Sequence, residues 1–412
     1  MFEKNTEIHY RYIPYRKHDL VEMCLQESTL SGQEGTFRQL YNMLSSVYHF
    51  EFHQVVESLK DSYAPFDPDA DTRKYDNPRE PATLNFVELL EGVLEKANYE
   101  AISQADLNQA LSQASLFRIR LHVDFDDFAE VLMFCRGVSR REETISSWFG
   151  LVKKKICFTN YDRVVLYLRF RDDYEEVDQH MPRCKPGATL LKLFQNVPMA
   201  DLEMLFPNTA VRMRTIDKLL IGVPALFSGG VVLTTKLGAS LVLIGSLAGF
   251  WLGFSAEPVE LDDAALMGLL AGLAALGGYL WKQFNNFKNR KLRFMQTLTQ
   301  NLYFKNLDNN AGVFHRLVDD AEEEECKEAI LAYYFLLINQ PLSKAGLDHK
   351  IEQWLENKWQ CSVDYEIDDA LNKLLTLGLV KEDAQKFSAV PIEKGIQNLD
   401  QRWDDYFRSS CK

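Results

Sequence analysis

Two histidines have the spacing that allows side chains of one helix to share a metal ion. His49 and His53 lie four residues apart in a segment with helical periodicity, and Glu57 follows one turn further along. Residues at i and i+4 of a helix lie on the same face, so both imidazoles can reach one ion. The helix is amphipathic in its own right, so an ordinary surface helix is the favoured interpretation. We therefore predict no metal site and keep the pair only as candidate ligands.

An acidic segment further along imitates part of a calcium loop. Asp67, Asp69 and Asp71 have the spacing of the first three ligands. Thr72 stands at the sixth position and Pro78 at the twelfth, where such a loop needs glycine and a bidentate glutamate. The segment is therefore predicted to be a solvated turn.

A second carboxylate cluster follows a predicted strand and lies close to two arginines. It could form a catalytic group or an ordinary ion-pair network, but nothing in the sequence supplies a nucleophile or a positioned base. Phosphate-loop, dinucleotide-binding, nucleophile-elbow and zinc-protease motifs are absent from the sequence. We therefore predict no catalytic residue and no cofactor, and lean towards a protein that is not an enzyme. The cluster comprises Asp124, Asp126, Asp127 and Glu130, with Arg136 and Arg140.

The composition limits the classes of partner. The chain of 412 residues is 46% hydrophobic and 12% aromatic, which suits two to four packed domains. Its net charge of −13 disfavours a nucleic-acid partner, because such binding depends on Lys and Arg that neutralise phosphates. The seven cysteines are odd in number and lack C-x-x-C spacing, so we expect reduced thiols.

An apolar region between Leu219 and Trp281 dominates the hydropathy pattern. Leu237–Phe254 and Ala264–Trp281 are uncharged runs of eighteen residues each, near the lower limit for crossing a hydrocarbon core of about 30 Å. Basic residues flank the region on both sides, and the positive-inside rule then places both flanks in the cytoplasm. A buried hairpin in a globular protein is the alternative.

The preferred interpretation is a transmembrane helical hairpin over 237–281 that anchors the protein in the cell inner membrane with two spans. The segment 216–236, broken by Pro224, is expected to be interfacial or re-entrant. The N- and C-terminal domains would both be cytoplasmic, and the lipid bilayer would be a partner.

Small residues recur at four-residue spacing in both predicted spans. Such stripes let helix backbones approach closely in lipid. They would pack the two helices of one hairpin or, alternatively, assemble hairpins from several chains. The predicted packing residues are Gly245, Gly249, Gly253, Gly268 and Gly272.

The segment 282–321 mixes basic and aromatic residues and is predicted to be a juxtamembrane helix. Cations just inside a span suit anionic headgroups, although the first helix of the C-terminal part is an equally good interpretation. The predicted membrane-surface residues are Lys282, Lys288, Arg290, Lys291 and Arg293.

The two ends of the chain are predicted to fold as separate domains. Residues 1–215 show helical periodicity first and alternating, β-rich stretches afterwards, which indicates an α+β domain. Residues 322–412 have the order of a winged helix, with the third helix beginning at Asp364. That helix presents carboxylates where a DNA-reading helix needs basic or amide side chains, so we favour contact with protein.

Several phrases before and at the apolar region resemble the uncharacterised family that includes transmembrane protein 143. The resemblance implies a membrane-anchored protein with a family-specific globular domain and without a settled activity, and it transfers no catalytic residues. The sequence lacks the presequence of an organellar member, which points to a bacterial inner membrane. The phrases are RYIPYRKHDLVEM (11–23), YAPFDPD (63–69), FDDFAEVLMFCRG (125–137), YDRVVLYLRF (161–170), KLFQNVPMADLEMLFP (192–207) and RMRTIDKLLIGVPAL (212–226).

These observations favour a membrane-anchored, non-enzymatic scaffold or interaction protein, which self-assembles as a homo-oligomer or binds a protein partner at the cytoplasmic face. One alternative is an oligomeric pore or transport-linked assembly built from the hairpins. A further alternative is a metal-dependent, membrane-bound hydrolase that uses His49 and His53.

Overall fold

The chain forms two compact units. The computed structural model describes residues 10–27, 29–69, 83–103, 107, 120–147, 152–174, 186–212, 245, 249–253, 263–339 and 341–408. Unit 1 comprises Met1–Gln113, Asp124–Leu202 and Lys305–Lys412, and unit 2 comprises Ala114–Val123 and Glu203–Phe304. Unit 1 therefore combines both ends of the chain, and the fold as a whole is α+β.

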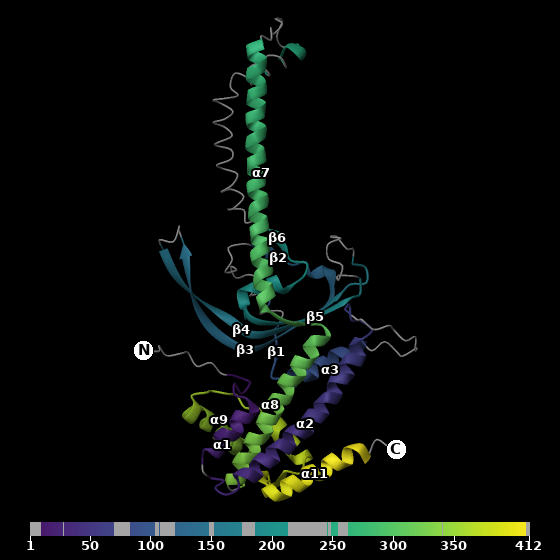
Figure 1. The fold of residues 1–412 in the computed structure, drawn as a ribbon, viewed down its shortest axis with the longest axis vertical. Coiled ribbons are helices and arrows are strands. Elements are labelled where there is room, and N and C mark those ends of the chain that lie inside the picture. Colours follow the sequence, from purple (N-terminus) through teal and green to yellow (C-terminus); the bar gives the residue numbers. More distant parts are fainter. Residues whose placement is uncertain are drawn as a thin grey trace. The chain divides into compact units, whose positions relative to one another are not determined.

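Unit 1 contains an antiparallel sheet with the strand order β1-β3-β4-β5-β7 (Figure 1). The long hairpin of β3 and β4 places Cys135 opposite Val164, and Phe194 of β5 lies opposite Val164 on its other side. Val165 and Tyr167 lie two residues apart and both enter the core, as expected for one face of a strand. The strands are β1 (Glu100–Ala101), β3 (Phe128–Ser147), β4 (Val152–Phe170), β5 (Thr189–Pro198) and β7 (Asn306–Asn309).

Helix α8 (Ala311–Ile338) is the central element of unit 1, and α1, α2 and α3 lie around it (Figure 1). Its residues are buried on nearly every side, which suits a helix whose apolar side chains surround its axis. Apolar residues at helical spacing on α2 form the matching face. The bounds are α1 (Lys17–Leu25), α2 (Glu34–Tyr63) and α3 (Thr83–Lys96).

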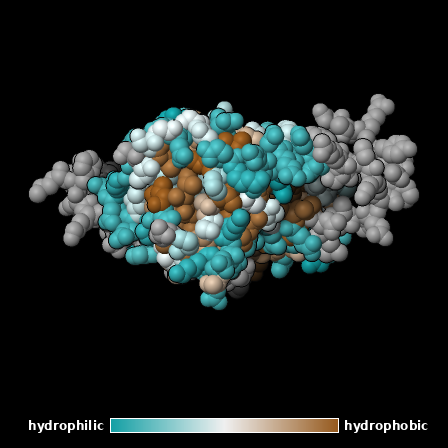
Figure 2. Space-filling view, turned by 90° about the horizontal axis from the view of Figure 1, so that it is seen from below, coloured by the Kyte–Doolittle hydropathy of each residue, from teal (hydrophilic) through white to brown (hydrophobic). Residues whose placement is uncertain are grey.

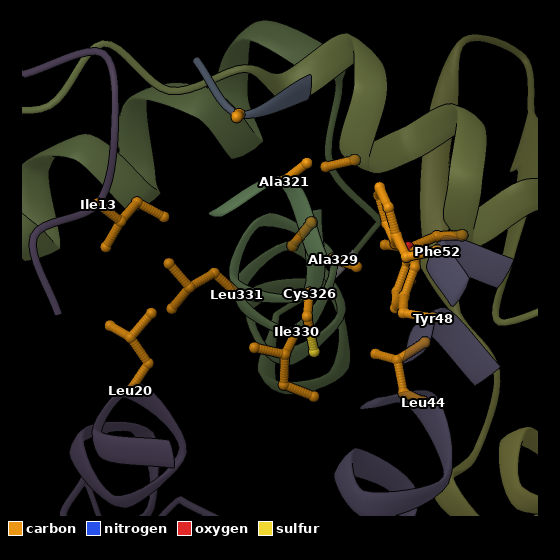
Figure 3. Close-up of a cluster of buried hydrophobic side chains, with 14 of the residues drawn as sticks. Ile13, Leu20, Leu44, Tyr48, Phe52, Ala321, Cys326, Ala329, Ile330 and Leu331 are labelled. Atoms are coloured by element: carbon orange, nitrogen blue, oxygen red, sulfur yellow. The ribbon is translucent and has the colours of Figure 1, made fainter. Parts of the chain in front are cut away.

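The hydrophobic core surrounds α8. Figure 3 shows Ala321, Cys326, Ala329, Ile330 and Leu331 of α8 between two groups of apolar side chains. One group is Ile13 and Leu20, and the other is Leu44, Tyr48 and Phe52 of α2. Four aromatic rings, with centroids 5.0 to 5.7 Å apart, extend the core from these helices to the sheet. They are Tyr63 of α2, Phe86 of α3, Tyr167 of β4 and Phe314 of α8.

The C-terminal elements pack within unit 1 as well. Ser343 caps α9 by accepting a hydrogen bond from the Gly346 amide at 3.3 Å, and α10 buries Leu371 and Leu374 against the same core as α8. They occupy the region for which the sequence suggested a winged helix. The elements are α9 (Lys344–Trp359), α10 (Ile367–Thr376), β8 (Val380–Asp383), β9 (Lys386–Ala389) and α11 (Ile392–Arg408).

Unit 2 is built on the long helix α7 (Asp263–Lys305), together with a two-stranded pairing of β2 (Arg120–His122) and β6 (Ala210–Arg212). The short 3-10 helices η1 (Phe125–Asp127) and η2 (Met199–Leu205) complete the described elements.

Seen from below, the surface is mainly hydrophilic with apolar areas between the polar ones (Figure 2). Among the described residues, all the large apolar side chains recorded as exposed lie in unit 2 except Val138 and Trp403.

The predicted transmembrane hairpin is wrong. No helix within the described part of the chain is long and apolar enough to cross a membrane. The inner-membrane localisation with two spans, which was predicted from this hairpin, is wrong as well. Ala264–Trp281 is instead the first part of α7, which continues through the basic segment to Lys305 without a break. Most of Leu237–Phe254 lies outside the described residues.

The error arises because the prediction counted uncharged residues and did not weigh their apolar area. The prediction relied on the length of the uncharged runs, whereas the free energy of transfer from water into a membrane depends on apolar area. Half of Ala264–Trp281 consists of alanine and glycine, whose side chains offer little apolar area each. An uncharged run of this composition is therefore weaker evidence for a membrane span than its length implies.

Candidate functional site

An exposed apolar stripe runs along α7. Leu270, Trp281, Leu292 and Tyr303 recur every eleven residues, and their exposed fractions are 53%, 68%, 56% and 76%. Eleven residues are close to three turns of an α-helix, so these four side chains lie almost in one line. At 1.5 Å per residue the line is about 50 Å long. We call these four residues the α7 stripe.

Further apolar residues widen the α7 stripe. Phe284 and Met295 follow Trp281 and Leu292 by three residues each, and both are exposed. The ring centroids of Trp281 and Phe284 are 6.4 Å apart. Met267, three residues before Leu270, is also exposed. These residues widen the apolar face, and Lys288, seven residues after Trp281, lies on the same face. An exposed apolar face usually marks an interaction site.

After its first residue, Asp263, helix α7 carries charges of one sign. Lys282, Lys288 and Arg293 are exposed, and no Asp or Glu occurs in the sequence between Asp263 and Asp308. Arg290 and Lys291 belong to α7, but their side chains lie outside the described part of the structure. The stripe is thus accompanied by positive charge over its C-terminal half. The membrane-surface role of these residues stays a prediction.

The glycines predicted to pack a hairpin are only partly described. A Cβ atom built at Gly245, Gly249 or Gly253 would meet no atom within 4 Å. Gly268 and Gly272 lie within α7, and nothing further is described at their side-chain positions. The packing role of these glycines stays a prediction.

A buried cluster of charges lies where α8 meets the sheet in unit 1. Arg136 of β3 pairs with Glu324, and its Nη1 atom lies 3.2 Å from Oδ2 of Asp320. Lys327 donates to Glu324 at 2.9 Å, and Arg163 of β4 pairs with Asp320. Positive and negative side chains alternate in this cluster, so each buried charge has a partner.

The N-terminal segment covers this charged cluster. The Ile13 amide donates to Oε2 of Glu324 at 3.1 Å, and the Lys327 ammonium donates to the Ile13 carbonyl at 2.9 Å. The Tyr12 ring lies 4.4 Å from the Arg136 guanidinium, and the Tyr99 hydroxyl donates to Asp320 at 3.1 Å. The segment is therefore held by both backbone and side-chain contacts.

The electrostatics of the cluster preserve its charges. Burial by itself would lower the pKa of Arg136, but the carboxylates of Glu324 and Asp320 raise it, so the guanidinium stays charged. Burial, with the nearby Asp162 carboxylate, raises the pKa of Tyr12 to about 12. Tyr12 therefore stays protonated at neutral pH and serves as a hydrogen-bond donor.

A cavity of about 300 Å³ opens beside the cluster, with Tyr12, Arg136 and Lys327 in its lining. Arg136 and Lys327 pair with Glu324, and Arg136 and Arg163 pair with Asp320, so every cation of the cluster already has a carboxylate partner. We interpret it as a structural ion-pair network, since such networks also produce perturbed pKa values.

The two candidate metal ligands lie side by side on one face of α2. His49 and His53 are both exposed and both line an open cavity of about 680 Å³. Nδ1 of His49 lies 2.9 Å from Oε2 of the buried Glu322, which also accepts a hydrogen bond from Lys17 at 2.7 Å. Within the described residues, no group of three His, Cys, Asp or Glu side chains is placed to hold a metal. The pair therefore stays only a candidate for metal binding here.

One carboxylate of each predicted cluster makes a local hydrogen bond. Oδ1 of Asp67 accepts from the Asp69 amide at 3.0 Å, which forms a turn, and Asp71 lies outside the described residues. Asp124 caps η1 by accepting from the Asp126 amide at 3.2 Å.

The sequence did not predict which carboxylates of α8 pair with Arg136, Arg163 and His49. The acidic run of α8 looks like a solvated helix face, yet three of its four consecutive glutamates, Glu322, Glu324 and Glu325, are buried. One signal was available, because the run leads directly into the apolar AILAYYFLLI, which requires a buried helix.

Taken together, the fold and these sites define an α+β protein with an exposed apolar helix and a charge-paired core. Residues 161–312 match a family model described as a protein of unknown function, DUF3754. The matched region includes the second half of β4, all of β5 and the whole of α7. No solved structure matches the chain. The match agrees with an uncharacterised family and assigns no activity.

Proposed function

We propose that this chain is a non-enzymatic interaction protein that binds a protein partner through the α7 stripe. The observation that carries this proposal is the eleven-residue recurrence of large, exposed apolar side chains on one helix. Such a pattern would otherwise leave apolar area in contact with water at a cost of about 25 cal/mol per Å².

The side chains on the stripe are of the types that dominate protein interfaces. Trp281 and Tyr303 are aromatic anchors with large exposed areas, and Leu270 and Leu292 lie in line with them. Tryptophan and tyrosine account for a large share of the residues whose truncation costs more than about 2 kcal/mol of binding energy. A long helix that presents them in one line suits a groove or a second helix.

The sign of the charge on α7 favours an acidic partner. Lys282 and Lys288 accompany the stripe, and the helix offers no carboxylate after Asp263. Two copies of the basic half that paired in parallel would bring like charges together, which opposes self-assembly in that arrangement. We therefore propose an amphipathic helix of the partner that presents apolar residues flanked by Asp and Glu.

The relationship to the family that includes transmembrane protein 143 remains part of this proposal. Phrases such as YDRVVLYLRF (161–170) support it, and the matched domain of unknown function covers that phrase. The relationship assigns no role to any residue, so the proposed function depends on α7 alone.

The test uses the full chain and a fluorescent synthetic helix with leucine on one face and glutamate on the other. We expect saturable binding by fluorescence anisotropy, and Leu292→Glu should weaken it by more than about tenfold, or 1.4 kcal/mol. Asn289→Glu is the matched control, because it adds the same charge at an exposed polar position of α7 and should change the affinity much less.

Three outcomes would contradict the proposal. Leu292→Glu could bind the peptide as tightly as Asn289→Glu. The unmodified chain could form a dimer that Leu292→Glu dissociates in sedimentation equilibrium, which would make a second copy the occupant. It could also bind vesicles of anionic lipid while ignoring the peptide.

A further inference from the structure

The His49 side chain is held by a carboxylate that lies far away in the sequence. Nδ1 of His49 in α2 is 2.9 Å from Oε2 of Glu322 in α8, although 273 residues separate them. Glu322 is buried, with 9% of its side chain exposed, whereas 76% of the His49 side chain is exposed. The carboxylate therefore fixes one edge of the imidazole and leaves the other edge towards solvent.

This contact also orients the ring. A histidine that donates from Nδ1 to a carboxylate keeps the lone pair of Nε2 free. Carboxylate–histidine pairs of this kind orient most histidines that bind metals and make the ring a better ligand. Glu322 in turn is held by Lys17, whose ammonium donates to Oε1 at 2.7 Å. The supporting contacts therefore come from two other helices, α1 and α8.

His53 supplies a second imidazole at the same place. It follows His49 by one helical turn, a rise of about 6 Å, and both side chains line the cavity of about 680 Å³. Two imidazoles at this spacing can bind the same ion from one helix face. The cavity is open, so water or an external ligand can occupy the remaining positions of the ion.

The charges around the cavity permit a cation. Lys17 and Glu322 are the charged side chains among its described lining residues, and they pair with each other. The remaining lining residues are serines, histidines and aromatic residues, among them Phe50 and Trp403. The positive charge of Lys17 is thus offset by Glu322.

We propose that His49 and His53 form a binding site for a divalent transition-metal ion of the zinc or nickel class, with Glu322 as the positioning residue for His49. Imidazole ligands suit these ions, whereas calcium and magnesium prefer oxygen ligands. The site has two protein ligands and an open coordination sphere. It is independent of α7 and of the function proposed for that helix.

The test measures binding of the metal alone to the full chain after treatment with a chelator. Isothermal titration with zinc chloride should show one site per chain, and His49→Ala and His53→Ala should each abolish it. His349→Ala is the matched control, because His349 is an exposed histidine on α9 outside this cavity, and the variant should bind zinc like the unmodified chain.

A further variant tests the positioning role of Glu322. Loss of such a supporting carboxylate lowers metal affinity by roughly 10- to 100-fold, and Glu322→Gln should fall within that range. The Tm of each variant without metal shows whether it is folded. Copper(II) bound in place of zinc should show coupling to imidazole nitrogen by electron paramagnetic resonance, and His53→Ala should reduce that coupling.

The proposal would be overturned if the double variant His49→Ala/His53→Ala bound zinc as tightly as the unmodified chain. Equal loss of binding in His349→Ala would also overturn it, because the ion would then bind histidines without regard to site. Unchanged affinity in a folded Glu322→Gln would remove the positioning role.

Discussion

Arg136 of β3 and Glu324 of α8 form an ion pair that joins the sheet to the central helix, with 8% and 0% of their side chains exposed. Glu324 also accepts hydrogen bonds from the Ile13 amide and from Lys327. One buried carboxylate thus connects a strand, a helix and the N-terminal segment. Such a pair is costly to break from one side, because the remaining charge stays buried without its partner.

Replacing Arg136 should therefore destabilise the protein strongly. For Arg136→Met we expect the free energy of unfolding to fall by roughly 3–5 kcal/mol in urea titrations. The control is Arg141→Met, because Arg141 is 48% exposed and lies 3.7 Å from Asp162, and it should cost less than about 1 kcal/mol. Similar losses in both variants would show that the buried pair has no special role.

The buried carboxyl group of Glu328 should make the stability of the fold depend on pH. Burial raises its pKa well above the ordinary value of about 4.3, against the opposing hydrogen bond from Asn98 at 3.0 Å. The folded protein then keeps a proton that the unfolded chain releases, so this group lowers stability as pH rises above about 4.3. Glu328→Gln removes the titration and keeps an acceptor for Asn98. Its free energy of unfolding should exceed that of the unmodified chain by an amount that grows with pH.

Urea titrations from below pH 3 up to pH 8 would check this, with Glu27→Gln as a control of opposite sign at the acidic end. Hydrogen bonds from Lys358 and Trp354 lower the pKa of Glu27, so this group adds stability as pH rises through its folded pKa towards about 4.3. Glu27→Gln should lose that contribution. A difference between Glu328→Gln and the unmodified chain that does not change with pH would contradict the buried, protonated state of Glu328.

Local patterns in the sequence predicted part of this fold. The spacing of Phe37, Leu40, Leu44 and Phe52 predicted a helix, and these side chains are the buried face of α2. The same periodicity placed His49 and His53 together on one side of the helix. Patterns of this kind succeed because neighbours along a helix are also neighbours in space.

Contacts between distant segments could not be predicted in this way. Glu322 approaches His49, and Arg136 approaches Glu324, only because α8 packs between α2 and the sheet. Nothing within a window of a few residues specifies such partners. The apolar run at Ala264–Trp281 failed for a different reason, since uncharged length and apolar area are separate quantities.

Asn310 should be sensitive to substitution because its side chain ties three segments together. Its amide oxygen accepts from the Tyr63 hydroxyl and the Leu191 amide, each at 3.1 Å, and its amide nitrogen donates to Asp69 at 2.6 Å. Asn310→Ala would leave buried groups of Tyr63 and Leu191 without a partner, and we expect a loss of about 2 kcal/mol or more. The exposed neighbour Asn309 is the control, and Asn309→Ala should cost less than about 0.5 kcal/mol. Thermal unfolding of both variants measures the difference.

Replacement of glycine by alanine should have opposite effects on stability at Gly137 and at Gly92. Gly137 in β3 has a φ of +72°, and an added Cβ would lie 2.5 Å from Oδ2 of Asp162, so Gly137→Ala meets both backbone strain and a clash. We expect it to cost more than about 1 kcal/mol. Gly92 lies inside α3 with nothing within 4 Å of an added Cβ, so Gly92→Ala should stabilise the helix by roughly 0.5–1 kcal/mol. Urea titrations that gave both variants the same sign would contradict the backbone strain and the clash with Asp162 expected at Gly137.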